Sequence, residues 1–338
     1  MKHLIFLTIT LFIAPVIFSQ NAQGFIENGK TMFDQRKFNE SIIQFTKAIN
    51  IDEKNIEAYY YRANAKHEMR DYKGAIVDLT KLIEFNPKNT DAFYSRGISK
   101  FMSQDYKGAI TDATRAINLG SGIQDNHFWL RAESNSSLGN YEAAIKDYNE
   151  VIKLKPNNSK FYYSRGESKN LLYKYQEAID DYTKAIDLDP KNPYIYWSRG
   201  YAKIELNDSL GGIDDITKGI ELNPSDSEAF YKRGFIRYHL KDYTKAIADF
   251  SKVIELDKNH IGAFVLRAGI HYSLKNNQLA IDDYTSAIKI DPNNGYAYYM
   301  RGQNHFFLGQ EEKGCLDLSK AATLGVSGAA ESFEKFCN

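Results

Sequence analysis

The sequence predicts an all-α solenoid of stacked helix pairs, and repeating features of its 338 residues lead to this prediction. An arginine recurs at a nearly constant step of 34 residues, and the residue after each one is Gly or Ala. Within each period, apolar residues recur at three- and four-residue spacing, as on one face of an amphipathic helix. A fixed period of this length is typical of repeats that bury their apolar faces only against their neighbours. The recurring arginines are Arg62, Arg96, Arg131, Arg165, Arg199, Arg233, Arg267 and Arg301.

The first 19 residues have the pattern of a secretory signal peptide. A basic start at residues 1–3 precedes the uncharged apolar run at residues 4–18, which is followed by Ser19. This order is typical of a cleaved leader. The alternative is an uncleaved membrane anchor, although the run is shorter than the roughly 20 residues that span hydrocarbon. We therefore expect cleavage after Ser19 and an exported protein, either periplasmic or secreted.

Each period encodes two helices and a stop, and residues 159–192 show this most clearly. A first helix is expected from Ser159 to about Tyr173, and a second from Tyr175 to about Asp187. Pro190 ends the unit because proline lacks the backbone donor and disfavours helix in the residue before it. Helix, turn, helix and stop therefore form the repeating unit.

Four places in the period carry the same kinds of residue in most units: a small residue eighth, an aromatic seventeenth, an alanine twentieth, and Asp-Pro or Asn-Pro at the end. The aromatic residues are Phe38, Tyr72, Tyr106, Tyr141, Tyr175 and Tyr243, and the alanines are Ala75, Ala109, Ala144, Ala178, Ala246 and Ala280. In these places the chain resembles the tetratricopeptide repeat (TPR) family. The resemblance covers nine units, at residues 22–55, 56–89, 90–123, 125–158, 159–192, 193–226, 227–260, 261–294 and 295–328.

The resemblance implies a right-handed superhelix over residues 20–328, in which the first helices of the units line a concave groove that holds a peptide or a partner protein. The segment after it, residues 329–338, carries an apolar stripe that includes Ala329, Phe333 and Phe336. An array of repeats needs such a segment to cover its exposed end. We therefore expect a C-terminal capping helix there.

An aspartate follows each recurring arginine by sixteen residues, on the expected second helix. The first unit has Asn28 and Gln44 at these two places, so both charges are present together or absent together. This pairing predicts a ladder of Arg–Asp bridges that clamps the two helices of each unit. The alternative is a row of arginines that grips an acidic ligand. The aspartates are Asp78, Asp112, Asp147, Asp181, Asp215, Asp249, Asp283 and Asp317.

Aromatic residues gather at the places that line the concave face in the TPR family. We expect a groove lined by Tyr60, Tyr94, Trp129, Tyr163, Trp197, Tyr201, Tyr231, Phe235 and Tyr238. Rings with a polar handle suit an extended or helical peptide. The alternative is that these rings pack one repeat against the next, which is a common role of tyrosine at the fifth place in this family.

Two local features stand out from the regular pattern. Cys315 and Cys337 are the only cysteines, and in an exported protein they either form a disulfide or remain two unpaired core thiols. The sixth unit carries Gly211, Gly212 and Gly219 on its expected second helix. Each helical glycine costs about 1 kcal/mol relative to Ala, so we expect this helix to be the softest.

Composition and motifs bear on the function. Lys plus Arg equals Asp plus Glu at 43 each, so the basic excess that nucleic acid demands is absent. The sequence shows no zinc-ligand spacing, phosphate loop or nucleophile motif, so we expect no metal, no cofactor and no catalytic residue. The prediction is a non-enzymatic scaffold for a peptide or protein partner. A self-assembling structural protein is the main alternative, followed by a glycan-binding protein or an enzyme.

Overall fold

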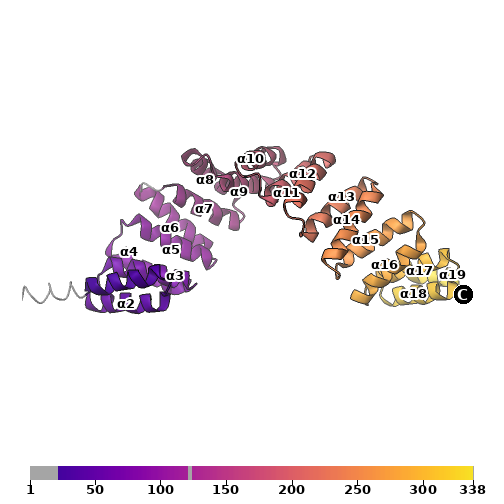
Figure 1. The fold of residues 1–338 in the computed structure, drawn as a ribbon, viewed down its shortest axis with the longest axis horizontal. Helices are drawn as coiled ribbons and strands as arrows, with labels where there is room; N and C mark the ends of the chain where they lie inside the picture. Colours follow the sequence, from indigo (N-terminus) through magenta and orange to yellow (C-terminus); the bar gives the residue numbers. More distant parts are fainter. Residues whose placement is uncertain (1–21, 121–123, 338) are drawn as a thin grey trace, which may run out of the picture. The chain divides into compact units, whose positions relative to one another are not determined.

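Every regular element that the structure describes is an α-helix, which confirms the predicted fold class (Figure 1). The structure is a computed structural model and describes residues 22–120 and 124–337. The predicted signal peptide at residues 1–19 lies outside the described residues. The chain divides into two compact units between Leu188 and Asp189, and each is described by itself.

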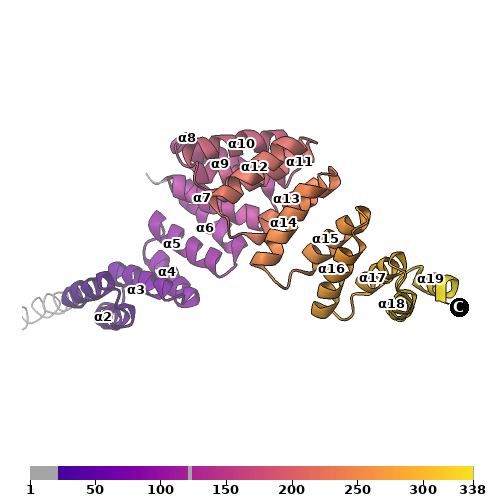
Figure 2. The ribbon, with the colours of Figure 1, turned by 45° about the vertical axis from the view of Figure 1, so that its right-hand side comes forward.

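The first compact unit consists of antiparallel helix pairs in which each helix packs on the next along the chain (Figures 1 and 2). After a helix at residues 22–34, its helices are α2 (Phe38–Ile51), α3 (Ile56–Glu68), α4 (Tyr72–Phe85), α5 (Thr90–Met102), α6 (Tyr106–Leu119), α7 (Gln124–Ser137), α8 (Tyr141–Leu154), α9 (Ser159–Asn170) and α10 (Tyr175–Leu188).

The second compact unit continues the same alternation and ends with one additional helix. Its helices are α11 (Pro193–Glu205), α12 (Ser209–Leu222), α13 (Ser227–His239), α14 (Tyr243–Leu256), α15 (Ile261–Ser273), α16 (Asn277–Ile290), α17 (Gly295–Phe307), α18 (Glu311–Thr323) and α19 (Ala329–Cys337). The short helix α19 packs on α18, at the place where the sequence predicts a cap.

Side-chain caps explain where many of the helices begin. The Asn55 side chain accepts a hydrogen bond from the Ala58 N–H at the start of α3, and Asn294 does the same for Ala297 at the start of α17. Asp71 caps α4 through the N–H of Gly74 at 2.9 Å. Such caps satisfy N–H groups that have no partner inside the helix.

The turn between the two helices of each unit has one residue in a left-handed conformation, always at the fifteenth place. Its φ lies between 59° and 79°. This conformation costs a non-glycine residue about 1–2 kcal/mol, yet only two of the nine units use glycine. The residues are Arg36, Arg70, Gln104, Gly139, Tyr173, Asn207, Lys241, Lys275 and Gly309.

The small residue at the eighth place lies close to the other helix of its unit. A Cβ at Gly200 of α11 would lie 2.9 Å from the Gly212 carbonyl oxygen of α12. Ala63 and Ala268, at the same place in other units, are fully buried. The helices of each pair therefore pack at close range, which brings the side chains that flank this place together.

Candidate functional site

Each of the eight recurring arginines forms a two-pronged ion pair with the aspartate sixteen residues later. The Nη2 to Oδ1 distance is 2.6–2.7 Å in every pair. Nε donates to the same carboxylate, at 2.8–2.9 Å in seven pairs and at 3.1 Å for Arg233. The aspartates are 1–6% exposed. These groups lie between the helices of each pair, as the clamp interpretation predicts.

These ion pairs have further partners that the sequence pattern did not predict. In seven units Nη1 of the arginine donates to a side-chain oxygen on the preceding unit's second helix, such as Thr46 for Arg62. The guanidinium also lies over the aromatic ring three residues earlier, 5.4–5.9 Å from its centroid. A second cation four residues later joins the same aspartate in five units: Lys66, Lys100, Lys169, Lys203 and Arg237.

These contacts leave the arginines little surface to offer a ligand. Their side chains are 11–23% exposed, and their donors already bond to the aspartate and, in seven units, to the neighbouring repeat. For Arg301, the hydrogen bond to Asp317 raises the pKa above its ordinary value. A binding surface must therefore be sought among other residues.

In the first compact unit, the predicted groove aromatics are half-buried and pack on neighbouring groups. Their partners are Tyr61 for Tyr60, His127 for Tyr94, the Lys160 ammonium for Trp129, and Tyr182 for Tyr163. Of the four, Tyr94 lines a hollow of about 190 Å³, together with His67. The contacts of Tyr94 and Trp129 join neighbouring repeats, as the packing alternative predicts, whereas those of Tyr60 and Tyr163 lie within one repeat.

Glu133, at the ninth place of its unit, is occupied by internal hydrogen bonds. Its Oε1 accepts from Trp129 Nε1 at 3.1 Å, Tyr148 Oη at 3.0 Å and Ser164 Oγ at 3.1 Å. Burial is the main cause that raises the pKa of Tyr148 above its ordinary value, so its hydroxyl remains a donor. This carboxylate links α7, α8 and α9 rather than facing an open groove.

Trp197 corrects the expected list of groove residues. Its side chain is buried, 8% exposed, and packs against Gly219 of α12. It therefore belongs to the core of the second compact unit and offers almost no surface to a partner. Tyr238 is half-buried, and its ring lies 6.1 Å from that of Tyr243.

The remaining three predicted residues line one open groove between α11 and α13, which we call the α11–α13 groove. Tyr201, Tyr231 and Phe235 line it, and its volume is about 440 Å³. Phe235 is 43% exposed although its ring is wholly apolar. The other lining residues are Ile204, Glu205, Glu228, Lys232 and Ile236.

Charged groups at the rim of this groove are arranged around Tyr201. The Lys232 ammonium lies 4.6 Å from the centroid of the Tyr201 ring and 3.7 Å from the Glu228 carboxylate. Burial and, to a smaller extent, Glu228 raise the pKa of Tyr201 above its ordinary value, so the phenol stays neutral. The groove thus combines an apolar floor with a polar rim.

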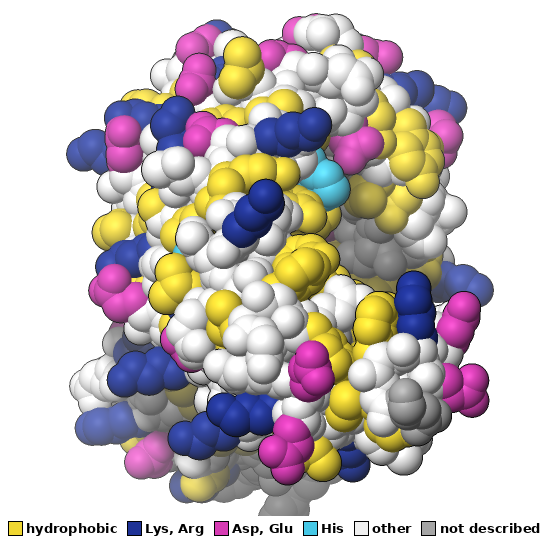
Figure 3. Space-filling model, turned by 90° about the vertical axis from the view of Figure 1, so that its right-hand side faces the viewer, with side chains coloured by type: hydrophobic (Ala, Val, Ile, Leu, Met, Phe, Trp, Pro, Cys, Tyr) yellow, Lys and Arg dark blue, Asp and Glu magenta, His cyan; other side chains and the backbone are white. Residues whose placement is uncertain are grey.

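A second pocket, which we call the C-terminal pocket, lies near the end of the chain and was missed by the sequence reasoning. It has a volume of about 440 Å³ and is formed by α15, α17, α18 and α19. The space-filling view shows hydrophobic side chains reaching the surface at the end of the molecule that carries the C-terminus (Figure 3). The lining residues are Tyr272, Gln303, Phe306, Phe307, Leu318, Ser332 and Phe336.

The positions of these residues within their repeats could have predicted the pocket from the sequence. Tyr272 and Phe306 occupy the twelfth place of their units, Phe307 the thirteenth and Gln303 the ninth. These are places that face the groove in the TPR family. At the ninth and twelfth places, the predicted groove included only Tyr201, Phe235 and Tyr238.

A disulfide between Cys315 and Cys337 joins α18 to α19 beside this pocket, with Cα atoms 5.7 Å apart. Cys315 is half-buried. The sequence left open whether the two cysteines form a disulfide or remain thiols, and in the structure they form the disulfide.

Within residues 22–120 and 124–337, the structure contains no group of three or more His, Cys, Asp or Glu side chains arranged to hold a metal ion. Within the same residues, none of the helices combines the length and the apolar character needed to cross a membrane.

Comparison with protein families identifies repeats in five segments of the chain. A family described as TPR repeat matches residues 136–169 and 174–206. Families described as Tetratricopeptide repeat match residues 56–89, 227–260 and 261–294. Together these segments span half of the chain. A search of curated proteins finds no significant match.

Solved structures of TPR proteins share the fold. YrrB, described as a TPR protein with an unusual peptide-binding site, is 18% identical over 56% of this chain and 97% of its own, with a TM-score of 0.51. A tetratricopeptide repeat protein from Parabacteroides merdae is 16% identical over 74% of this chain and 99% of its own, also with a TM-score of 0.51. At these identities the likeness concerns the fold alone.

Proposed function

Because the chain belongs to the tetratricopeptide repeat family, we propose that it is an exported, non-catalytic scaffold that holds a peptide segment of a partner protein in the α11–α13 groove. The observation that carries the proposal is the open floor formed by Tyr201, Tyr231 and Phe235. Exposed apolar rings inside a polar rim are characteristic of binding surfaces. YrrB, which shares the fold, is described as having a peptide-binding site, so the fold is compatible with such a ligand.

Two further observations support the export and the scaffold role. The apolar leader at residues 1–19 and the Cys315–Cys337 disulfide both suit an oxidising compartment, either a periplasm or the cell exterior. The aspartates that recur in the repeats are held in buried ion pairs with arginine. They are therefore occupied by packing rather than free for acid–base chemistry.

Selection of binding peptides from a displayed library against the full mature chain tests the proposal. We expect Phe235→Ala to lower the affinity for the selected peptides by about tenfold or more, as for an aromatic anchor at a binding site. Leu210→Ala is the matched control, because Leu210 is 72% exposed on α12 and outside the groove. Equal affinity for both variants would contradict the proposal.

The same protein distinguishes self-assembly from peptide binding. We expect light scattering to report a molecular mass that Phe235→Ala does not change. An oligomer that Phe235→Ala dissociates would show instead that the groove joins copies of this chain. Mass spectrometry of the exported protein tests the leader, and an N-terminus that still begins at Met1 would contradict the proposed cleavage after Ser19.

A further inference from the structure

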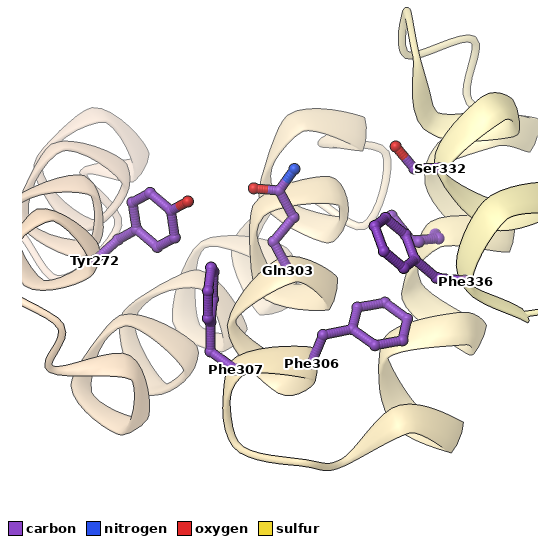
Figure 4. A pocket seen from close by; sticks show the side chains of 7 residues that line it. Tyr272, Gln303, Phe306, Phe307, Ser332 and Phe336 are labelled. Atoms are coloured by element: carbon purple, nitrogen blue, oxygen red, sulfur yellow. The ribbon is translucent and has the colours of Figure 1, made fainter.

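In the C-terminal pocket, one pair of aromatic rings lies on each side of the Gln303 primary amide. The Gln303 side chain lies in the middle (Figure 4). On one side, the rings of Tyr272 and Phe307 lie 5.8 Å apart, and on the other those of Phe306 and Phe336 lie 5.6 Å apart. Phe307 is 64% exposed and Phe336 is 56% exposed. Large apolar surfaces remain open here within the part of the chain that the structure describes.

The Gln303 amide is half-buried and makes no hydrogen bond to any described residue of the chain. A primary amide both donates and accepts, so it can bond to the N–H and C=O of a single peptide group. The side chains that line this pocket carry no charge, whereas those of the α11–α13 groove include Glu205, Glu228 and Lys232. An uncharged occupant avoids the cost of burying an unpaired charge among these rings.

One wall of the pocket depends on the disulfide. Phe336 and Ser332 belong to α19, whose nine residues include only one buried residue, Ala329. Helices this short are marginal without tertiary contacts. The Cys315–Cys337 bridge ties the end of α19 to α18, and Phe336 directly precedes Cys337. The bridge therefore holds the Phe306–Phe336 ring pair together.

We propose that the C-terminal pocket binds an uncharged aromatic residue of a peptide segment, with Gln303 on the peptide backbone, and that it does so only while the Cys315–Cys337 disulfide is intact. The proposal rests on the proposed function, since it adds a second anchor for a peptide partner. Reduction breaks the S–S bond and adds two electrons and two protons from an external dithiol, leaving two thiols. The α19 wall then separates from α18, and the pocket loses one of its ring pairs.

Amide hydrogen exchange of the full mature chain tests the redox-dependent wall directly. In the oxidised protein we expect protection over residues 329–337, and after reduction an exchange about tenfold or more faster in this segment. Residues 243–256 form α14, which contributes no residue to the pocket, and they are the internal control that should not change. The Cys315→Ser, Cys337→Ser double variant should exchange at the reduced rate with or without reductant. Equal protection of α19 in the oxidised and reduced proteins would overturn the redox dependence.

Binding is tested with N-acetyl-4-fluorophenylalaninamide, an uncharged aromatic residue with two amide groups, observed by fluorine NMR. We expect it to bind the oxidised protein and to bind about tenfold or more weakly after reduction or with Phe306→Ala. Gln303→Leu keeps the rings and removes the amide. A several-fold loss of probe affinity in this variant supports the contact of Gln303 with the peptide backbone, even if Phe306→Ala fails to fold. Unchanged binding to Gln303→Leu would overturn that contact.

A matched variant separates this site from the α11–α13 groove. Phe235→Ala should leave binding of the free probe unchanged, because Phe235 lines the other site. Probe binding that is lost with Phe235→Ala and kept with Phe306→Ala, or no binding to the oxidised protein, would overturn the pocket proposal. Neither result depends on the selected peptides, so failure of the pocket and failure of the proposed function remain distinguishable.

Discussion

The indole of Trp197 fills the space that a side chain at Gly219 would need, because a Cβ there would lie 2.1 Å from Nε1 of Trp197. Trp129 stands at the same fifth place in its own unit, where Val151 takes the place of Gly219. There the indole is half-buried and its Nε1 donates to Glu133. A glycine on the second helix thus accompanies burial of the tryptophan on the first.

This contact makes Gly219→Ala a destabilising change. Overpacking of a filled site costs about 1–3 kcal/mol, which exceeds the gain of about 1 kcal/mol when Ala replaces a helical glycine. Gly269→Ala is the control, because its nearest neighbour would be Tyr284 Oη at 4.0 Å. We expect it to stabilise the protein by up to about 1 kcal/mol. Urea unfolding measures both, and stabilisation by both changes would contradict the packing argument.

The ion-pair ladder predicts that Arg165→Lys and Asp181→Asn lower the free energy of unfolding by similar amounts. Breaking a buried, hydrogen-bonded pair costs about 3–5 kcal/mol, and lysine cannot reproduce the two-pronged contact. Arg115→Lys is the control, since Arg115 is exposed. Urea unfolding again provides the measurement. If Arg165→Lys and Asp181→Asn both left the urea unfolding transition unchanged, the ion pairs would contribute nothing to stability.

The left-handed turn residues predict that a glycine substitution stabilises the chain. Lys275 has φ 61° between α15 and α16. Lys275→Gly removes a conformational cost of about 1–2 kcal/mol, partly offset by the larger backbone entropy of glycine in the unfolded chain. We expect a net gain of about 0.5–1 kcal/mol. Lys275→Ala keeps the conformational cost and serves as the control, so an equal gain from alanine would argue against this explanation.

His67 predicts a dependence of stability on pH. Burial lowers the pKa of its imidazole below the ordinary value of 6.5, and its Nδ1 lies 3.0 Å from Ser99 Oγ. As the pH falls below 6.5, the unfolded state takes up the proton first, so stability is full above this value and is lost toward the lowered pKa. We expect His67→Gln to unfold with a weaker pH dependence between 7 and 5. An unchanged pH dependence would contradict the role of His67.

Features that recur from unit to unit could be predicted from the sequence. The helix pairs follow from apolar spacing and proline stops, and the Arg–Asp pairs follow from charges that appear or disappear together. Both features depend on contacts within a repeat and with the neighbouring repeat, so the sequence of one period is enough to predict them. The Thr46 contact to Arg62 spans two repeats and was missed, because the threonine carries no charge to reveal the pairing.

The candidate sites were less predictable. Three of nine expected groove aromatics share the α11–α13 groove, and Trp197 lies in the core. Exposure of a ring at a fixed place depends on the volume of the side chains opposite it, which differs between repeats. The C-terminal pocket depends in addition on α19, which is not a repeat and therefore falls outside the period.

By itself, the sequence determined the helical repeat and the charges that clamp each helix pair, because these depend on spacing along a single period. Only the tertiary structure decided which rings remain open, which tryptophan is buried and which wall the Cys315–Cys337 bridge supports. These outcomes depend on how the volumes of side chains from different helices fit together. Such a fit is a property of the packed structure and cannot be read from one helix alone.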